Sequence, residues 1–200
     1  MFAYEGSQRG YLSTAVDVAN ITFTGQHIAE SSDSLKTDEN IGLIVSSTGV
    51  LKNLNAESIA TINESLPIVN LSNIINDKKV FGVISRIEDS GTDERTHSAG
   101  NFVSSYEKLD NRLIVNSIGE GAVWVIDKDG PLENGDYITT CTVPGYGVPQ
   151  ADDLLHNYTV AKITQDCSFD LSSTGYTCEE ITIDGVTYLR ALVACTYHCG

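Results

Sequence analysis

Short runs of β-branched and aromatic residues, separated by turn residues, recur along the whole chain. No stretch keeps a 3.6-residue spacing of apolar positions over three turns, so the pattern indicates strands and not long helices. A short helix is predicted only within Leu66–Lys79. Strands are predicted at Val18–Thr24, Ile41–Ser46, Val80–Ser85, Arg112–Asn116, Ala122–Ile126, Asp136–Cys141, Thr159–Thr164, Ile181–Ile183 and Val186–Ala194.

Two hairpins are predicted from their turn residues. Asp184-Gly185 separates the runs 181–183 and 186–188, and this dipeptide tolerates the positive φ angles of a type I′ turn. The second hairpin is predicted between 123–126 and 137–138, around the turn at Asp129-Gly130-Pro131.

The remaining segments place the boundaries of the domain. Ile28–Asn40 is polar and acidic without an apolar pattern, so we expect a long loop there. Residues 1–19 are interpreted as a linker or interface arm, and residues 20–200 as one folded domain. The expected fold is mainly β: a compact, antiparallel, barrel-like domain with long loops and little helix.

Composition and charge exclude several classes of protein. A chain of 200 residues with 41% hydrophobic residues can bury a core. Its 27 Asp and Glu against 12 Lys and Arg give a net charge of −15, which opposes binding to nucleic acid or to an anionic membrane surface. The apolar runs are too short for a membrane helix, and the start lacks the features of a secretory signal. We therefore expect a protein made in the cytoplasm, or a fragment of a longer one.

The acidic loop is the first candidate for chemistry. Glu30, Asp33, Asp38 and Glu39 surround Ser32, and His27 lies just before them. Two carboxyl groups held close together can act as acid and base toward a peptide carbonyl. The Ser32–Asp33 bond is itself a candidate for self-cleavage, because the aspartate carboxyl reaches its own backbone. A solvated surface loop is the alternative.

Five cysteines form the second candidate: Cys141, Cys167, Cys178, Cys195 and Cys199. Cys195, His198 and Cys199 could contribute to a zinc site near the C-terminus, but their spacing matches no standard zinc motif. Buried or free thiols and disulfides are the alternatives. No metal site is assigned beyond this alternative.

His156 is a supporting candidate, and it follows two aspartates in Asp152-Asp153-Leu154-Leu155-His156. The simpler interpretation is a structural histidine that pins a loop by hydrogen bonds. No phosphate loop, dinucleotide fingerprint, G-x-S-x-G or H-E-x-x-H motif is present, so we expect no cofactor and no small-molecule enzyme.

Several phrases taken together resemble the G2 peptidase family, the intramolecular-chaperone autoproteolytic domain of phage tail-spike and neck-appendage proteins and of related proteins in large DNA viruses. The resemblance covers about residues 20–200. It rests on the phrases ITFTGQH (21–27), VFGVIS (80–85), GNFVS (100–104), NSIGEGAVWV (116–125), LENGDYI (132–138), PGYG (144–147), LHNYTVAKI (155–163) and CTYHCG (195–200).

The resemblance implies a homotrimer that aligns an upstream spike or fibre segment and then releases itself by an intramolecular cut of glutamic-peptidase type. It also implies a virion-associated protein. A trimeric β-fibre needs such alignment because its pairings are non-local and slow to form. The local candidates for the catalytic pair are Glu30 and Asp33, on either side of the Ser32–Asp33 bond, with His27 and His156 in support.

The alternative is a non-proteolytic virion surface or structural module, used for trimerisation or host attachment. Ile28 follows Gln26-His27 where the family has arginine, and only 32 residues precede the candidate bond. Both observations favour this alternative. A metal-stabilised module is the third class considered.

Overall fold

The computed structural model describes residues 2–4, 7–10, 25–31, 35, 37–52, 59–60, 65–87 and 112–199. The protein is mainly β, as predicted, and the helices among these described residues are two short 3-10 turns, η2 (Asp38–Asn40) and η3 (Asp127–Asp129). The described strands are β1 (Phe2–Tyr4), β2 (Ser7–Gly10), β3 (Gly25–Ser31), β4 (Ile44–Lys52), β5 (Leu66–Leu71), β6 (Val80–Ile87), β7 (Arg112–Ile126), β8 (Tyr137–Thr140), β9 (Gly147–Pro149), β10 (Thr159–Ile163), β11 (Thr177–Ile183) and β12 (Val186–His198).

Five of these strands close into a first ring, which we call the N-terminal barrel. β3 runs parallel to β5, and the pairs β5–β4, β4–β6, β6–β7 and β7–β3 are antiparallel. Only the first half of β7 takes part, since β3 and β6 pair with residues 112–118. Closure leaves few exposed edges for pairing with other chains.

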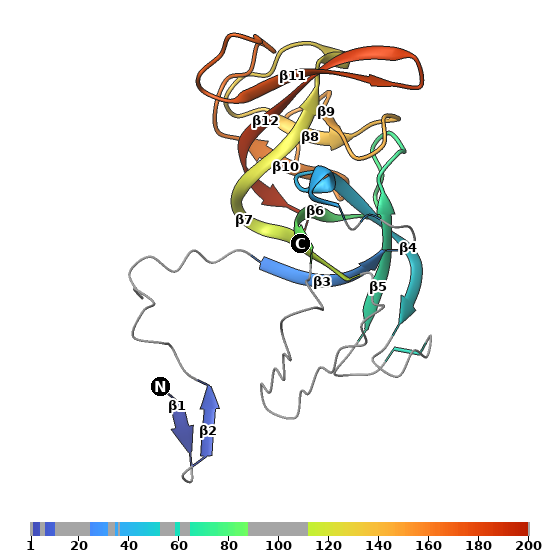
Figure 1. Cartoon of the computed structure of the whole chain (residues 1–200), viewed down its shortest axis with the longest axis vertical. Helices are drawn as coiled ribbons and strands as arrows, with labels where there is room; N and C mark the ends of the chain where they lie inside the picture. Colours follow the sequence, from blue (N-terminus) through green and yellow to red (C-terminus); the bar gives the residue numbers. More distant parts are fainter. Residues whose placement is uncertain are drawn as a thin grey trace.

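The second half of β7 belongs to another ring, the C-terminal barrel. Here β7 pairs with β12, β12 with β10, β10 with β8 and β8 with β9, and β9 returns to β7 by one parallel pairing. β11 extends this barrel as a hairpin on β12. Figure 1 shows β7 running from the level of β3 up to the level of β12, so one strand joins the two barrels.

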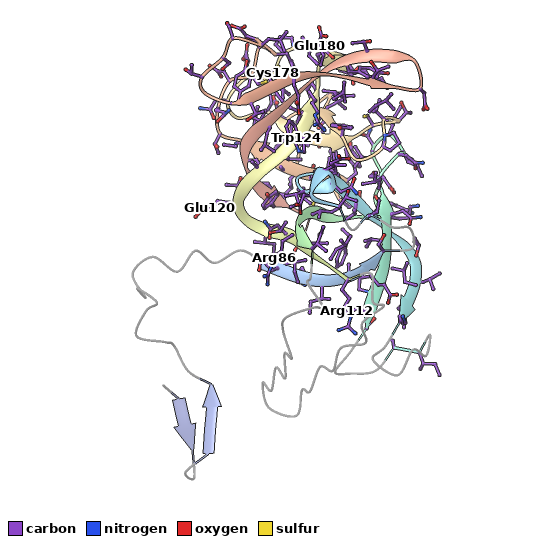
Figure 2. The ribbon with its side chains drawn as sticks, viewed as in Figure 1. Arg86, Arg112, Glu120, Trp124, Cys178 and Glu180 are labelled. Carbon is purple, nitrogen blue, oxygen red and sulfur yellow. The ribbon has the colours of Figure 1, made fainter. Side chains whose placement is uncertain are left out.

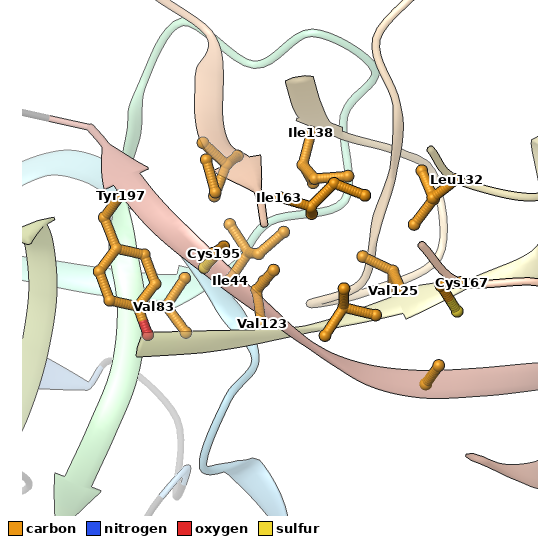
Figure 3. Close-up of a cluster of buried hydrophobic side chains, with 14 of the residues drawn as sticks. Ile44, Val83, Val123, Val125, Leu132, Ile138, Ile163, Cys167, Cys195 and Tyr197 are labelled. Carbon is orange, nitrogen blue, oxygen red and sulfur yellow. The ribbon is translucent and has the colours of Figure 1, made fainter. Parts of the chain in front are cut away.

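The barrels are filled by separate clusters of buried side chains that meet at their junction. The larger cluster fills the C-terminal barrel, includes the wholly buried Ile138 and Val123 with Tyr197 at one end, and extends to Ile44 of β4 and Val83 of β6 (Figure 3). The cluster of the N-terminal barrel is smaller: Ala29, Leu35, Val45, Val69, Ile84, Leu113 and Val115. A third cluster, around Tyr146 and Val148, packs against Trp124 and the β11–β12 hairpin.

Several predicted strands are confirmed with changed ends, and two were wrongly separated. β4 begins at Ile44 and not at Ile41, while β11 and β12 extend further than expected. The predicted strands 112–116 and 122–126 are one continuous strand, β7, because each half is paired in a different barrel. The predicted strand 18–24 lies outside the described residues.

Three other predictions are corrected. The helix predicted within 66–79 is wrong, because β5 and a series of turns occupy this segment. The loop predicted over 28–40 is wrong at its start, since residues 28–31 belong to β3. The hairpin predicted around Gly130 is wrong because β9 lies between β7 and β8. The other hairpin is confirmed: Ile183 pairs with Val186, and Asp184 and Gly185 have φ of 51° and 79°.

The contact between β6 and β7 depends on Gly82. Its φ is +154°, and a Cβ there would lie 2.3 Å from the Asn116 carbonyl oxygen. A larger residue would push β6 off β7 near the junction of the barrels. Within the described part of the chain, no helix is long and apolar enough to span a membrane.

Candidate functional site

Glu30 stands near the end of β3, where this strand meets two neighbours. Its partners in register are Arg112 on β7 and Ile68 on β5. Its Oε1 lies 3.0 Å from Nζ of Lys52, the last residue of β4, so the ion pair spans β5. The Glu30 side chain is 14% exposed and that of Lys52 31%, which limits screening of the pair by water.

His27 lies on the same strand but on the other face. Successive side chains of a strand point to opposite sides, so residues 27 and 30 diverge. The His27 side chain is exposed and its ring contacts Phe81, with centroids 5.8 Å apart. His27 therefore does not contact Glu30 directly, as its predicted supporting role would require.

The chain is anchored on both sides of the predicted scissile bond. Ser31 is buried at the end of β3, and Leu35 is buried in the core of the N-terminal barrel. The Leu35 carbonyl accepts hydrogen bonds from the Thr37 backbone N–H and from Asn40 Nδ2. Ser32 and Asp33, the predicted bond and second catalytic residue, lie outside the described residues.

The other carboxylates predicted in this acidic segment stand apart from Glu30. Asp38 and Glu39 form the exposed turn η2, and no contact joins them to β3 within the described residues. Their surroundings match the solvated surface interpretation for this part of the segment.

The side-chain contacts of His156 lie within its own loop. Its Nε2 lies 3.0 and 3.1 Å from the two carboxylate oxygens of Asp152, and its ring stacks on Tyr158 with centroids 4.5 Å apart. Hydrogen bonds from the Leu154 N–H and from His156 lower the pKa of the Asp152 carboxyl. These contacts hold the loop between β9 and β10, whereas Glu30 contacts β4, β5 and β7.

The alternation of side chains along β12 contradicts the zinc site considered for Cys195, His198 and Cys199. Cys195 and Cys199 lie on one face of the chain, and the odd-numbered face of β12 is turned into the core. His198 lies on the opposite face, edge-on to Tyr137 at 6.0 Å between centroids and 3.3 Å from Thr196 Oγ1. No group of three or more His, Cys, Asp or Glu side chains that could hold a metal ion occurs among the described residues.

All five cysteines are free thiols. Burial raises the pKa of Cys195 and of Cys199 to about 12, and it also raises the pKa values of Cys141, Cys167 and Cys178. Thiols with raised pKa values are poor nucleophiles at neutral pH. The cysteines therefore act as small core residues, which was one of the predicted alternatives.

Lys52 is the residue of this site that sequence reasoning missed. It is 22 positions from Glu30, and only the pairing of β4 with β5 brings the two together. Figure 2 places Arg112, the β7 partner of Glu30, at the bottom of the N-terminal barrel and Cys178 near the top of the view. Glu30 and the β11–β12 hairpin thus lie at opposite ends of the two joined barrels.

No protein-family model matches the chain, and no curated protein matches it in sequence.

Proposed function

We propose that the chain is a trimerising intramolecular chaperone domain of a viral tail spike or fibre, and that it breaks its covalent link to the upstream spike by cutting its own Ser32–Asp33 bond. The observation that carries this proposal is the Glu30–Lys52 ion pair at the end of β3. Glu30 precedes the bond by two residues, its mostly covered carboxylate is paired with the Lys52 ammonium, and Ser31 and Leu35 on either side of the bond are buried. The partners are then two further copies of the chain and the upstream spike segment.

The cut is a hydrolysis, so water is the only co-reactant. Glu30 accepts a proton from the attacking water, whose oxygen bonds to the Ser32 carbonyl carbon. The Lys52 ammonium balances the negative charge that develops near this centre. The Asp33 carboxyl then donates a proton to its own leaving nitrogen. The products are a Ser32 carboxylate and a new amino terminus at Asp33.

Exposed aliphatic side chains on two loops support self-association. Ile74 and Ile75 are 48% and 59% exposed, and Leu154 and Leu155 are 64% and 60% exposed. The two loops meet over β8, where Thr139 Oγ1 contacts Asn76 Oδ1 at 2.9 Å and the Tyr158 carbonyl at 3.4 Å. Clustered exposed aliphatic residues are typical of protein interfaces.

The alternative function is a virion surface or structural module without proteolysis. The same ion pair supports this alternative. A glutamate that is paired with a lysine can have a purely structural role, which here is to join β3 to β4. The two functions differ in whether the bond is cut.

Substitution of Glu30 tests the cleavage. Glu30→Gln keeps the size of the side chain and removes the charge, so we expect cleavage to stop while trimers persist. Glu179→Gln is the matched control, because it removes a carboxylate from another ion pair, with Arg190 on the β11–β12 hairpin. Equal cleavage in both variants, measured by mass under denaturing conditions, contradicts the role of Glu30.

The aliphatic loops are tested by charge. Ile75→Asp combined with Leu155→Asp places charges on both loops, and we expect the trimer to become a monomer in light scattering. Val186→Asp is the control, since Val186 is 49% exposed but lies on the β11–β12 hairpin. Trimers that survive the double substitution contradict an interface at these loops.

A further inference from the structure

We propose that cutting the chain between Ser31 and Leu35 does not by itself free the domain, because β3 stays in the N-terminal barrel as a non-covalent strand. The cut follows from the proposed function, whereas the retention of β3 follows from the strand contacts alone. The interaction surface is the slot between β7 and β5, and its partner is the extended segment 25–31.

Backbone pairing holds β3 along both edges. Residues 25–30 are paired antiparallel with residues 112–118 of β7, and Glu30 and Ser31 are paired in parallel with Ile68 and Val69 of β5. All of these partners lie after Leu35 in the chain. A break before Leu35 therefore leaves these pairings of β3 with β5 and β7 in place.

Side chains add to this pairing from several strands. Ala29 is fully buried in the core cluster that contains Leu113 and Val115. Glu30 pairs with Lys52, the Gly25 carbonyl accepts a hydrogen bond from Ser117 Oγ at 3.2 Å, and Gln26 Nε2 donates to Ser85 Oγ at 3.4 Å. The contacts come from β4, β6 and β7, so β3 is enclosed by the domain that follows it.

An empty slot would be costly. Withdrawal of β3 would expose the apolar side chains of Leu113, Val115 and Val69 and would leave backbone groups of β7 and β5 without their partners. Strand addition to an open sheet edge is a common way to bind an extended peptide. The fully buried position of Ala29 and the Lys52 ammonium favour the segment's own sequence, in which alanine is followed by glutamate.

Release of the upstream segment then takes two steps. The cut breaks the covalent link between β3 and the rest of the barrel. Withdrawal of β3 from its slot then lets the two fragments move apart. The second step sets how long the cut chaperone stays on its spike.

The experiment replaces residues 32–34 with a site-specific protease sequence in the full chain carrying an N-terminal tag. After cutting, which a denaturing gel follows, we expect both fragments to elute together in native size-exclusion chromatography and to separate in denaturant. Co-expression of residues 1–32 and 33–200 as two chains should give the same complex without any protease. Immediate separation of the fragments under native conditions in both arrangements overturns the proposal.

Ala29→Asp sharpens the test, because it places a charge at the buried position of β3. We expect it to reduce the retained upstream fragment by about tenfold or more. Val186→Asp is the control, because it places the same charge at an exposed position of the β11–β12 hairpin, away from β3, and it should leave retention unchanged. Thermal unfolding of uncut Ala29→Asp checks its fold, and if it is unfolded, Ala29→Ser is used with the same expected direction. Equal retention in wild type and in the folded Ala29 variant contradicts the proposal.

The outcomes separate this inference from the proposed function. If the natural chain stays uncut, the proposed self-cleavage fails, but the engineered cut still tests whether β3 is retained. If the natural chain is cut and its fragments separate at once, the proposed function stands and the retention of β3 is refuted.

Discussion

The two halves of β7 lie in barrels that are filled differently. In the C-terminal barrel, wholly buried Ile, Val and Leu side chains surround β7, and the buried Thr139, Thr140 and Thr159 all make hydrogen bonds. In the N-terminal barrel the core is smaller and includes Ala29. Ser46 of β4 and Asn70 of β5 are partners in register in this barrel. In the described part of the chain, Ser46 Oγ and Asn70 Oδ1 are buried without a hydrogen-bond partner.

This difference indicates where the protein can change. Buried polar atoms without hydrogen-bond partners reduce stability, and a smaller core loses less buried apolar contact when it opens locally. The candidate site and the strand that must be withdrawn both belong to the N-terminal barrel. The proposed cleavage site therefore belongs to the barrel with the smaller core.

Gly82→Ala should have the largest effect, because it breaks the junction between the barrels. The added Cβ meets the Asn116 carbonyl in a backbone conformation that alanine rarely adopts. We expect a loss of about 3 kcal/mol or more in the free energy of unfolding, measured by denaturant titration. Gly175→Ala is the control, since its added Cβ would lie no closer than 3.8 Å to a neighbour. Equal stability of both variants would contradict the close approach of β6 to β7.

Matched valine truncations compare the two cores directly. Val123 and Val69 are both fully buried, the first in the C-terminal and the second in the N-terminal cluster. We expect Val123→Ala to cost about 2 to 3 kcal/mol and Val69→Ala about half as much, because the smaller core relaxes more easily. Urea titration gives both values. A larger cost at Val69 would reverse the proposed ranking of the barrels.

Alkaline pH should weaken the C-terminal barrel. The pKa of Cys195 is about 12 in the folded state and 9.0 in an exposed thiol, so the unfolded state loses its proton first. The stability from this group is therefore complete below about pH 9 and falls as the pH rises toward 12. Cys195→Ala should flatten the decline in melting temperature above pH 9. An unchanged slope would show that the buried thiol does not cause it.

Mild acid should have the smallest effect. Burial lowers the pKa of His198, and nearby Lys162 adds to this. The unfolded state therefore binds a proton first as the pH falls through about 6.5, and stability is lost below that pH. Because His198 is partly exposed, we expect the free energy of unfolding to fall by less than about 1 kcal/mol between pH 7.5 and 5.5, measured by urea titration. His198→Gln should remove the difference, and a variant with the same pH dependence would assign it to another group.

The strands of both barrels were partly predictable from the sequence: β4, β6 and both halves of β7 were expected, whereas β3, β5 and β9 were not. Alternating β-branched residues and the Asp184-Gly185 turn indicated β8, β10 and the β11–β12 hairpin locally. β3 has the polar sequence GQHIAES, and its strand conformation depends on β7, far along the chain. β5 lies in the segment where a short helix was predicted, and its pairing with β4 and β3 makes it a strand.

The candidate site shows the same limit. Glu30 could be selected as a carboxylate near the only Ser–Asp bond in the chain. Its contact with Lys52 could not, because no local spacing links residues 30 and 52 and only the sheet brings them together. Likewise, the tail Cys195–Cys199 resembled a ligand set in one dimension, but strand alternation turns His198 away from the thiols.

The most direct test of the account is the intact mass of the protein, measured under denaturing conditions after expression with an N-terminal tag. We predict two species, one of which begins at Asp33 and ends at Gly200. Cleavage at another bond would keep self-cleavage and reject the site at Ser32–Asp33. A single uncut mass of 21.6 kDa plus the tag would contradict the proposed self-cleavage and favour a trimerisation or surface module without proteolysis.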